Sequence, residues 1–134
     1  MKDPAKRKSR GQSLVEVALV LPILVMMMMG LLDFGRAYYT VVALRDAADE
    51  GAAYGASNPG DVAGIRLRAS EASRALVNVE IDDVSVEAPS LTTGDPITVT
   101  VTTTLVLYTP FANTLVSDSE LTLRGHSTRA IISP

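Results

Sequence analysis

Residues 14–32 read LVEVALVLPILVMMMMGLL, an apolar stretch in which Glu16 is the single charged residue. An α-helix needs about 20 predominantly apolar residues to cross the hydrocarbon core of a bilayer, so this stretch predicts one transmembrane helix. Pro22 lies inside it and predicts a kink in the helix, because neighbouring groups in a membrane can satisfy the carbonyl that proline leaves free.

The charges on the two sides of the stretch differ. Before it stands a basic leader made of Lys2, Lys6, Arg7, Lys8 and Arg10, with Asp3 as its one acidic residue, and Asp33 follows directly after. The positive-inside rule predicts a cytoplasmic N-terminus and an extracytoplasmic remainder, hence a single-pass protein of the cytoplasmic membrane. Without the leader the chain is acidic, which argues against binding to nucleic acid phosphates.

Three kinds of segment compete for this stretch: a cleaved secretory signal, a signal anchor that stays uncut, and a prepilin signal that is cut before the apolar residues. A secretory signal has an apolar core of about 7–15 residues that ends in an A-x-A-like site. The stretch here is longer and continues through Met26–Met29 into Gly30, so the secretory signal fits least. The other two differ in whether residues 1–11 remain in the mature protein.

Glu16 carries the sharper evidence on that point. An ionised carboxylate at the bilayer centre costs about 2.5–3.5 kcal/mol. The plain explanation for Glu16 is that it lies near the cytoplasmic surface, where it avoids most of this cost by reaching the headgroups or by taking up a proton. Its neighbours offer a second explanation. The junction KRKSRG|QSLVE resembles the G|xxxxE pattern of type IV prepilins, with Glu16 as the fifth residue after a cut between Gly11 and Gln12. This resemblance implies a prepilin peptidase that cuts there and a role for Glu16 in assembly, paired with the N-terminal amine of a neighbouring subunit.

The resemblance extends past the membrane. Residues 18–56, ALVLPILVMMMMGLLDFGRAYYTVVALRDAADEGAAYGA, are similar to TadE-type pseudopilins of the tight-adherence (Tad) class, which continue from the span into an acidic-aromatic-Gly-Arg stretch and an Ala-rich helix. That stretch consists here of Asp33, Phe34, Gly35, Arg36, Ala37 and Tyr38. The similarity covers roughly residues 10–57, and Asp33 stands where family members often have Glu. It implies a pseudopilin, by its length a minor one, that is incorporated into a surface pilus and has a role in cell adhesion. The partners that it implies are the prepilin peptidase, other pilin or pseudopilin subunits and the pilus assembly machinery.

Beyond the membrane the helical pattern continues. Apolar residues recur at steps of three or four, as in an amphipathic helix: Ala37, Val41, Leu44, Ala48 and Ala52. One helix is therefore predicted from about Ser13 to Ser57, roughly twice as long as the hydrocarbon is thick. Residues 41–55 either pack on the chain's own domain or, through their small side chains, let a neighbouring helix approach. Tyr38 and Tyr39 are interpreted as an aromatic anchor where the helix leaves the bilayer.

The remaining residues predict a small α/β domain. Asn58 is interpreted as the cap of a second helix with Pro59 at its first position and Asp61 three residues after the cap, followed by a stripe of Val62, Ile65, Ala69, Ala72 and Leu76. Alternating residues then predict a strand over 77–88, bulged near Asp82 and Asp83, and further strands over 97–107 and 120–131. The predicted fold class is α+β and pilin-like: a leader (1–11) that is cleaved, a membrane and spine helix (12–57), and an extracytoplasmic domain (58–134) with about three antiparallel strands.

No catalytic constellation assembles in the sequence. His126 is the only histidine, cysteine is absent, and the adjacent acids Asp49 and Glu50 point in different directions on a helix. We therefore expect no catalytic residues, no metal, no cofactor and no small-molecule substrate, and no enzyme activity. The alternative to a pseudopilin is an unprocessed, signal-anchored envelope protein with an external binding domain.

Overall fold

The structure is a computed structural model of the chain that describes residues 8–74, 77–109 and 119–132. Its elements are, in order, α1 (Lys8–Ser57), α2 (Val62–Ser73), a 3-10 helix η1 (Ile81–Asp83), β1 (Val84–Glu87), β2 (Pro96–Val106) and β3 (Glu120–Ala130). The predicted α+β class, with a long N-terminal helix, a short second helix and three antiparallel strands, is confirmed.

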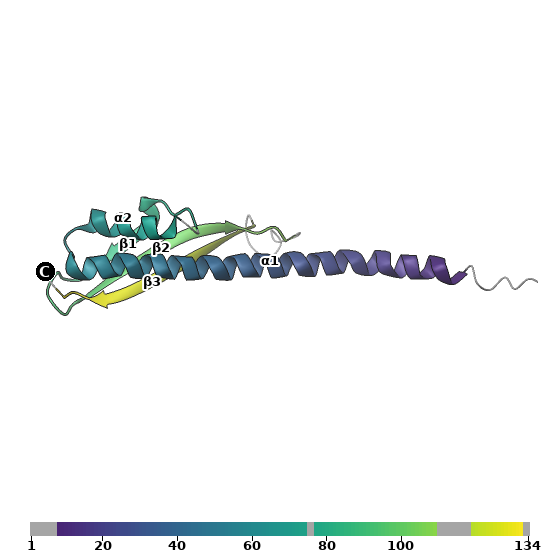
Figure 1. Ribbon diagram of the computed structural model, residues 1–134, viewed down its shortest axis with the longest axis horizontal. Coiled ribbons are helices and arrows are strands. Elements are labelled where there is room, and N and C mark those ends of the chain that lie inside the picture. Colours follow the sequence, from purple (N-terminus) through teal and green to yellow (C-terminus); the bar gives the residue numbers. More distant parts are fainter. Residues whose placement is uncertain (1–7, 75–76, 110–118, 133–134) are drawn as a thin grey trace, which may run out of the picture.

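Helix α1 is the axis of the molecule, and its N-terminal half projects away from the folded domain (Figure 1). Residues from Gly11 to Met28 are exposed, and within the described residues α1 is the one helix long and apolar enough to cross a membrane. The helix ends at Ser57 as predicted and runs through Pro22 without interruption, with no sharp bend visible in Figure 1. Its predicted start near Ser13 is wrong: the helix begins at Lys8, because Lys, Arg and Gln are good helix formers that outweigh Gly11.

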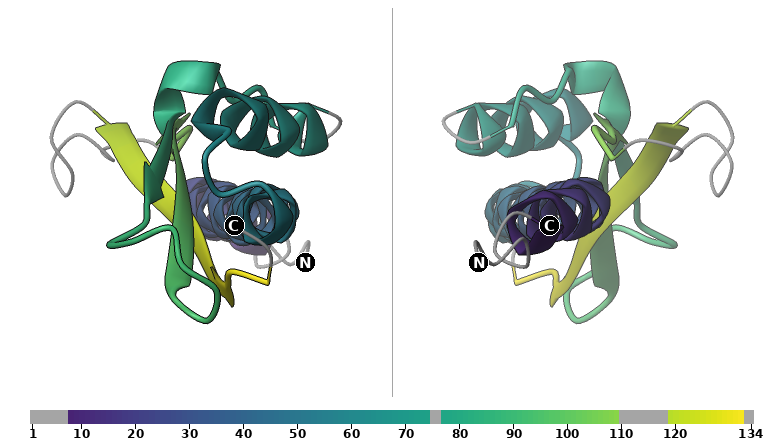
Figure 2. Two further views of the ribbon diagram at one scale, coloured as in Figure 1. Left: turned by 90° about the vertical axis from the view of Figure 1, so that its left-hand side faces the viewer. Right: turned by 90° about the vertical axis from the view of Figure 1, so that its right-hand side faces the viewer.

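The C-terminal half of α1 lies in the hydrophobic core. Helices α1 and α2 cover one face of the sheet, α1 over β2 and β3 and α2 over β1 (Figure 2). Of the predicted stripe, Leu44, Ala48 and Ala52 are fully buried, and Ala37 and Val41 are half-buried. Residues 41–55 thus pack on the chain's own domain, one of the two alternatives that the sequence left open. The small residues serve this packing, because a Cβ on Gly51 would lie 3.0 Å from the Cβ of Ala69 on α2.

The closest approach in the core is between α1 and β3. A Cβ built on Gly125 would lie 2.4 Å from the backbone carbonyl carbon of Leu44 and 2.5 Å from the backbone nitrogen of Arg45. Ordinary carbon–carbon contacts are about 3.5–4.0 Å, so only glycine fits here. Strand β3 therefore packs with its backbone directly against the backbone of α1.

The sheet has the order β1-β2-β3 with both pairs antiparallel, and β2 pairs with β3 from Pro96↔Ala130 to Val106↔Glu120. The predicted strands over 97–107 and 120–131 are confirmed to within one residue at each end. The predicted strand over 77–88 is wrong in its first half, where Ile81–Asp83 form a 3-10 turn. The Asp83 carboxylate accepts a hydrogen bond from the backbone N–H of Glu80, the local bonding by which aspartate competes with a strand.

The predicted cap of α2 is also wrong. The Asp61 carboxylate accepts a hydrogen bond of 2.9 Å from the backbone N–H of Gly64 and caps the helix, which begins at Val62. Asn58 instead closes α1, because its backbone and side-chain N–H groups both donate to the carbonyl of Tyr54. Of the predicted stripe on α2, Ile65 and Ala69 are buried, Val62 and Ala72 are exposed, and Leu76 lies outside the described residues.

Candidate functional site

Asp33 stands at the point where α1 changes from an exposed apolar helix to the core helix of the domain. Its side chain is the most buried carboxylate of the described residues, with 4% of the residue exposed. On the helix it lies one residue after the apolar stretch 14–32, so a charge is taken out of solvent at the base of the domain. A carboxylate in such a place needs hydrogen-bond donors around it.

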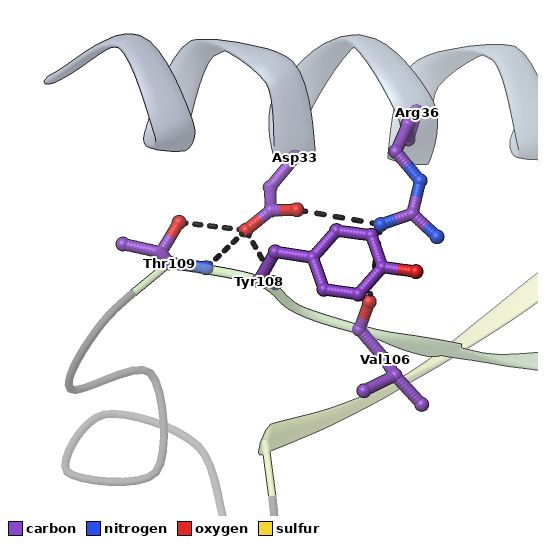
Figure 3. Close-up of polar contacts among 5 residues, drawn as sticks. All are labelled: Asp33, Arg36, Val106, Tyr108 and Thr109. Atoms are coloured by element: carbon purple, nitrogen blue, oxygen red, sulfur yellow. Dashed lines mark hydrogen bonds and ion pairs between the residues drawn. The ribbon is translucent and has the colours of Figure 1, made fainter. Parts of the chain in front are cut away.

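Three donors from the segment after β2 meet this carboxylate (Figure 3). One oxygen, Oδ2, accepts hydrogen bonds from the backbone N–H of Tyr108 at 2.9 Å, the backbone N–H of Thr109 at 2.7 Å and the Thr109 hydroxyl at 2.6 Å. These donors lie 75 and 76 residues further along the chain. We call this arrangement, with the Arg36 contacts below, the Asp33 clamp; it ties the end of β2 to α1.

Arg36, one helical turn after Asp33, completes the clamp. Its Nη1 lies 3.5 Å from Asp33 Oδ1 and donates a hydrogen bond of 3.3 Å to the carbonyl of Val106. The guanidinium carbon also lies 4.3 Å from the centroid of the Tyr108 ring, a cation–π contact. The arginine thus contacts the last residue of β2 and the residue that donates to Asp33.

The clamp favours the charged form of Asp33. The Thr109 hydroxyl, the two backbone N–H groups and the Arg36 guanidinium together hold the pKa of Asp33 below its usual range, although burial acts in the opposite direction. The carboxylate is therefore ionised in the folded protein at neutral pH. An ionised Asp33 beside Arg36 makes the clamp a neutral pair overall, suited to a position next to apolar surroundings.

The predicted family-like stretch divides between two faces of α1. Asp33 and Arg36 point toward the domain, while Phe34 and Tyr38 are exposed and a Cβ added to Gly35 would meet no neighbouring atom within 4 Å. Tyr39 is exposed as well. Within this stretch the structure separates the residues that hold the domain from those that face outward.

The predicted processing and assembly residues lie far from the clamp. Gly11, Gln12 and Glu16 are all exposed on the projecting half of α1, and the junction between Gly11 and Gln12 is inside the helix. Glu16 remains the single charged side chain on the exposed apolar part. Nothing in the fold brings these three residues to the Asp33 clamp, so two separate parts of one helix carry the two sets.

Two further polar clusters join α1 to the rest of the domain. Asp49 accepts hydrogen bonds from the Ser127 hydroxyl at 2.8 Å and from Arg129 Nη2 at 2.7 Å. These donors lower the pKa of Asp49, Arg129 contributing most. Near the other end, the Tyr54 hydroxyl donates to Asp61 at 2.8 Å, which raises the pKa of Tyr54. Both clusters lie on exposed surface; the first joins α1 to β3 and the second joins α1 to the start of α2.

The candidate catalytic side chains lie apart from one another. His126 is exposed on the face of the sheet turned away from the helices, and Asp49 is engaged with Arg129 while its neighbour Glu50 is exposed on α1. Within residues 8–74, 77–109 and 119–132, no three His, Asp or Glu side chains gather in a way that could hold a metal ion.

Residues 11–53 match the model of a protein family described as TadE-like protein. The match confirms the resemblance predicted from the sequence over these residues, from Gly11 through Glu16 and the two clamp residues of α1, and it ends before α2 and the sheet. No curated protein and no solved structure matched the chain. The match indicates a protein associated with the Tad pilus, and the apolar half of helix α1 is consistent with a membrane anchor.

Proposed function

We propose that the chain is a minor pilin-like subunit, a pseudopilin, of a Tad-type (type IVc) pilus or secretion system, cut by a prepilin peptidase between Gly11 and Gln12. The observation that carries this proposal is the coincidence of the TadE-like match with that junction: the match begins at Gly11 and includes Glu16. The subunit is held in the cytoplasmic membrane by residues 14–32, with its N-terminus in the cytoplasm and its domain outside.

The shape of α1 supports a role in assembly. Its first half offers a bare apolar surface about 28 Å long, at 1.5 Å per residue over residues 14–32. Such a surface suits a bilayer before assembly and neighbouring helices after it. The second half is occupied by its own sheet and α2, so contacts between subunits through α1 fall on the projecting half and on the outward face beyond it.

Glu16 supplies the specificity in this proposal. A carboxylate among exposed apolar residues is costly unless it is paired, and a free amine at Gln12, created by the cut, is a charge of opposite sign that another subunit can offer. Pairing between the amine of one subunit and Glu16 of the next would set their offset along the helix. The role is structural, and the subunit acts through its partners without catalysis.

One observation favours the second candidate, an unprocessed signal-anchored envelope protein with an external binding domain. Helix α1 is continuous across the Gly11–Gln12 bond, whereas a peptidase requires access to an opened backbone. If the leader is retained, no free amine faces Glu16 and the domain outside the membrane serves a partner without polymerising.

The proposal is tested by replacing Glu16→Ala in cells that carry a complete Tad apparatus and comparing the amount of subunit in the membrane and in the sheared pilus fraction. We expect normal insertion and cleavage but loss of the subunit from the pilus fraction. Glu87→Ala, an exposed acid on β1, serves as the matched control and should assemble as the wild type does. Wild-type recovery of the Glu16→Ala variant with pili would contradict the proposal.

A further inference from the structure

Most of the aromatic residues that the structure describes gather at one level of the molecule. Of the five that the structure describes, four surround the base of the domain and are mostly exposed: Phe34 (70%), Tyr38 (68%), Tyr39 (53%) and Tyr108 (67%). The fifth, Tyr54, lies near the opposite end of the domain. We call the four the aromatic collar. Three belong to the outward face of α1, and Tyr108 comes from the end of the sheet on the other side.

The level of the collar matches the headgroup layer of a bilayer. Residues 14–32 span about 28 Å, close to the hydrocarbon thickness of about 30 Å, so that Asp33 falls at its outer edge. Phe34 to Tyr39 occupy roughly the next 9 Å along α1. Headgroups add about 5–8 Å on each side of the hydrocarbon, and Tyr rings prefer this layer because they are apolar with one polar end.

Tyr108 is held at this level by the Asp33 clamp. Its backbone N–H donates to Asp33, and its ring lies over the guanidinium of Arg36, 4.3 Å from the ring centroid. Figure 3 shows the ring alongside α1 between the two side chains. While these contacts are made, the end of β2 therefore stays beside the turn of α1 that carries Asp33 and Arg36.

We propose that the aromatic collar is a lipid-contacting surface, in which Tyr108 gives the sheet a contact of its own with the headgroup layer and the Asp33 clamp sets its depth. This inference rests on the membrane anchoring in the proposed function. The domain thus stands directly on the bilayer and is held in a set orientation around α1. Two contacts on opposite sides of the helix, Tyr38 and Tyr108, resist tilting of the domain.

The charges at this level point to aromatic partition as the source of the contact. Asp33 and Arg36 neutralise one another, and Glu120, exposed and paired with Val106 in the sheet, adds a negative charge. An excess of positive charge, which recognition of anionic lipids requires, is absent from the described residues of the collar. The lipid in question is therefore any with a zwitterionic headgroup, such as phosphatidylcholine.

The test uses the absence of tryptophan from the chain, which makes each introduced indole a single reporter. The full-length Tyr108→Trp variant is reconstituted in phosphatidylcholine vesicles, with and without lipid brominated near the glycerol end of its acyl chains, and the Leu24→Trp variant with and without lipid brominated near the methyl end. Val62→Trp, exposed at the start of α2 and far from the collar, is the matched control, and Leu24→Trp in the apolar stretch reports membrane insertion.

We expect the Tyr108→Trp indole to emit at shorter wavelength than the Val62→Trp indole and to lose fluorescence with the brominated lipid, while the Val62→Trp indole loses none. Adding Asp33→Ala to the Tyr108→Trp variant should reduce this loss. An unquenched Tyr108→Trp indole beside a quenched Leu24→Trp indole would overturn the inference and leave the anchoring intact. A short-wavelength but unquenched indole would do the same and indicate a second copy of the chain at the collar. If the Leu24→Trp indole is also unquenched, the membrane anchoring fails and the inference with it.

Discussion

Replacing Asp33→Ala should loosen the base of the domain. The change removes three hydrogen bonds that end on one carboxylate oxygen. Bonds to charged groups contribute about 1.5–3 kcal/mol each, but water can reach the exposed Tyr108 and half-buried Thr109, so about 1 kcal/mol for each is a reasonable net value. A total of about 3 kcal/mol lowers Tm by about 12–24 °C in a domain of about 100 residues.

The substitution Asp33→Asn separates charge from shape. The amide oxygen can still accept from the three donors, but the charge is lost and the amide NH₂ meets the Nη1 donor of Arg36. We expect a loss of about 1–1.5 kcal/mol in the free energy of unfolding, between wild type and Asp33→Ala. The assay is thermal unfolding of the full chain in detergent, followed by the near-ultraviolet circular dichroism of its tyrosines. Asp82→Asn, an exposed carboxylate on η1, is the control and should stay within about 0.5 kcal/mol of wild type.

The effect of Asp33→Asn should also depend on pH. The folded-state pKa of Asp33 is lowered, so its carboxylate stabilises the fold above the unfolded-state pKa of about 3.9, and this contribution is lost as the pH falls through the folded-state value. The difference in Tm between wild type and Asp33→Asn should therefore be constant near pH 7 and shrink below about pH 4. Equal Tm values for Asp33→Ala and the Asp82→Asn control at pH 7 would refute the clamp.

Three further substitutions, with Gly60→Ala as a control, probe the packing around α1 by the same melting experiment. Gly125→Ala should lower the free energy of unfolding by about 1–3 kcal/mol or more, because the added Cβ would lie 2.4 Å from the α1 backbone. Gly60→Ala should be nearly neutral, because a Cβ there would have no atom within 4 Å. Similar Tm values for the two variants would show that α1 and β3 are not in backbone contact. Leu44→Ala, at a fully buried position, should cost about 2–5 kcal/mol, and a loss below about 1 kcal/mol would place Leu44 outside the core. Asp49→Ala breaks an exposed pair with Arg129 and should cost about 1 kcal/mol or less, so a loss as large as that of Leu44→Ala would contradict the exposed position of the pair.

Elements with a long, regular pattern were predictable from the sequence. The spacing of Leu44, Ala48 and Ala52 has the period of a helix face, and all three are buried. The alternation of Ile97, Val99 and Val101 with threonines has the period of a strand, and these three are buried against the helices. In both cases burial of one face is enough to decide the backbone conformation, and the pattern records that burial directly.

Short polar segments were less predictable because several local arrangements compete. Asn58 and Asp61 are both good capping residues three positions apart, and which of them begins α2 depends on how α1 ends. Asp82 and Asp83 interrupt an apolar alternation, and the side chain of Asp83 turns the chain before β1 begins. In neither place does the order of residues alone decide between the alternatives.

Only the α1 residues of the Asp33 clamp lie in a stretch that stands out in the sequence. Asp33 and Arg36 stand out within a stretch that resembles a family, but their partners Tyr108 and Thr109 follow β2 and carry no local sign of the pairing. A contact between residues 75 positions apart is set by how the sheet packs on α1, which periodicity does not specify. The roles of Gly11 and Gln12 in cleavage and of Glu16 in assembly remain predictions, since they concern a peptidase and other subunits.

A cut between Gly11 and Gln12 is what distinguishes the proposed pilin-like subunit from a signal-anchored protein. The most direct test is the N-terminal sequence and intact mass of the membrane-extracted protein, expressed with an active and with an inactivated prepilin peptidase. We expect a chain that begins at Gln12 only when the peptidase is active. A chain that keeps residues 1–11 beside an active peptidase would contradict the proposed function and identify a signal-anchored envelope protein.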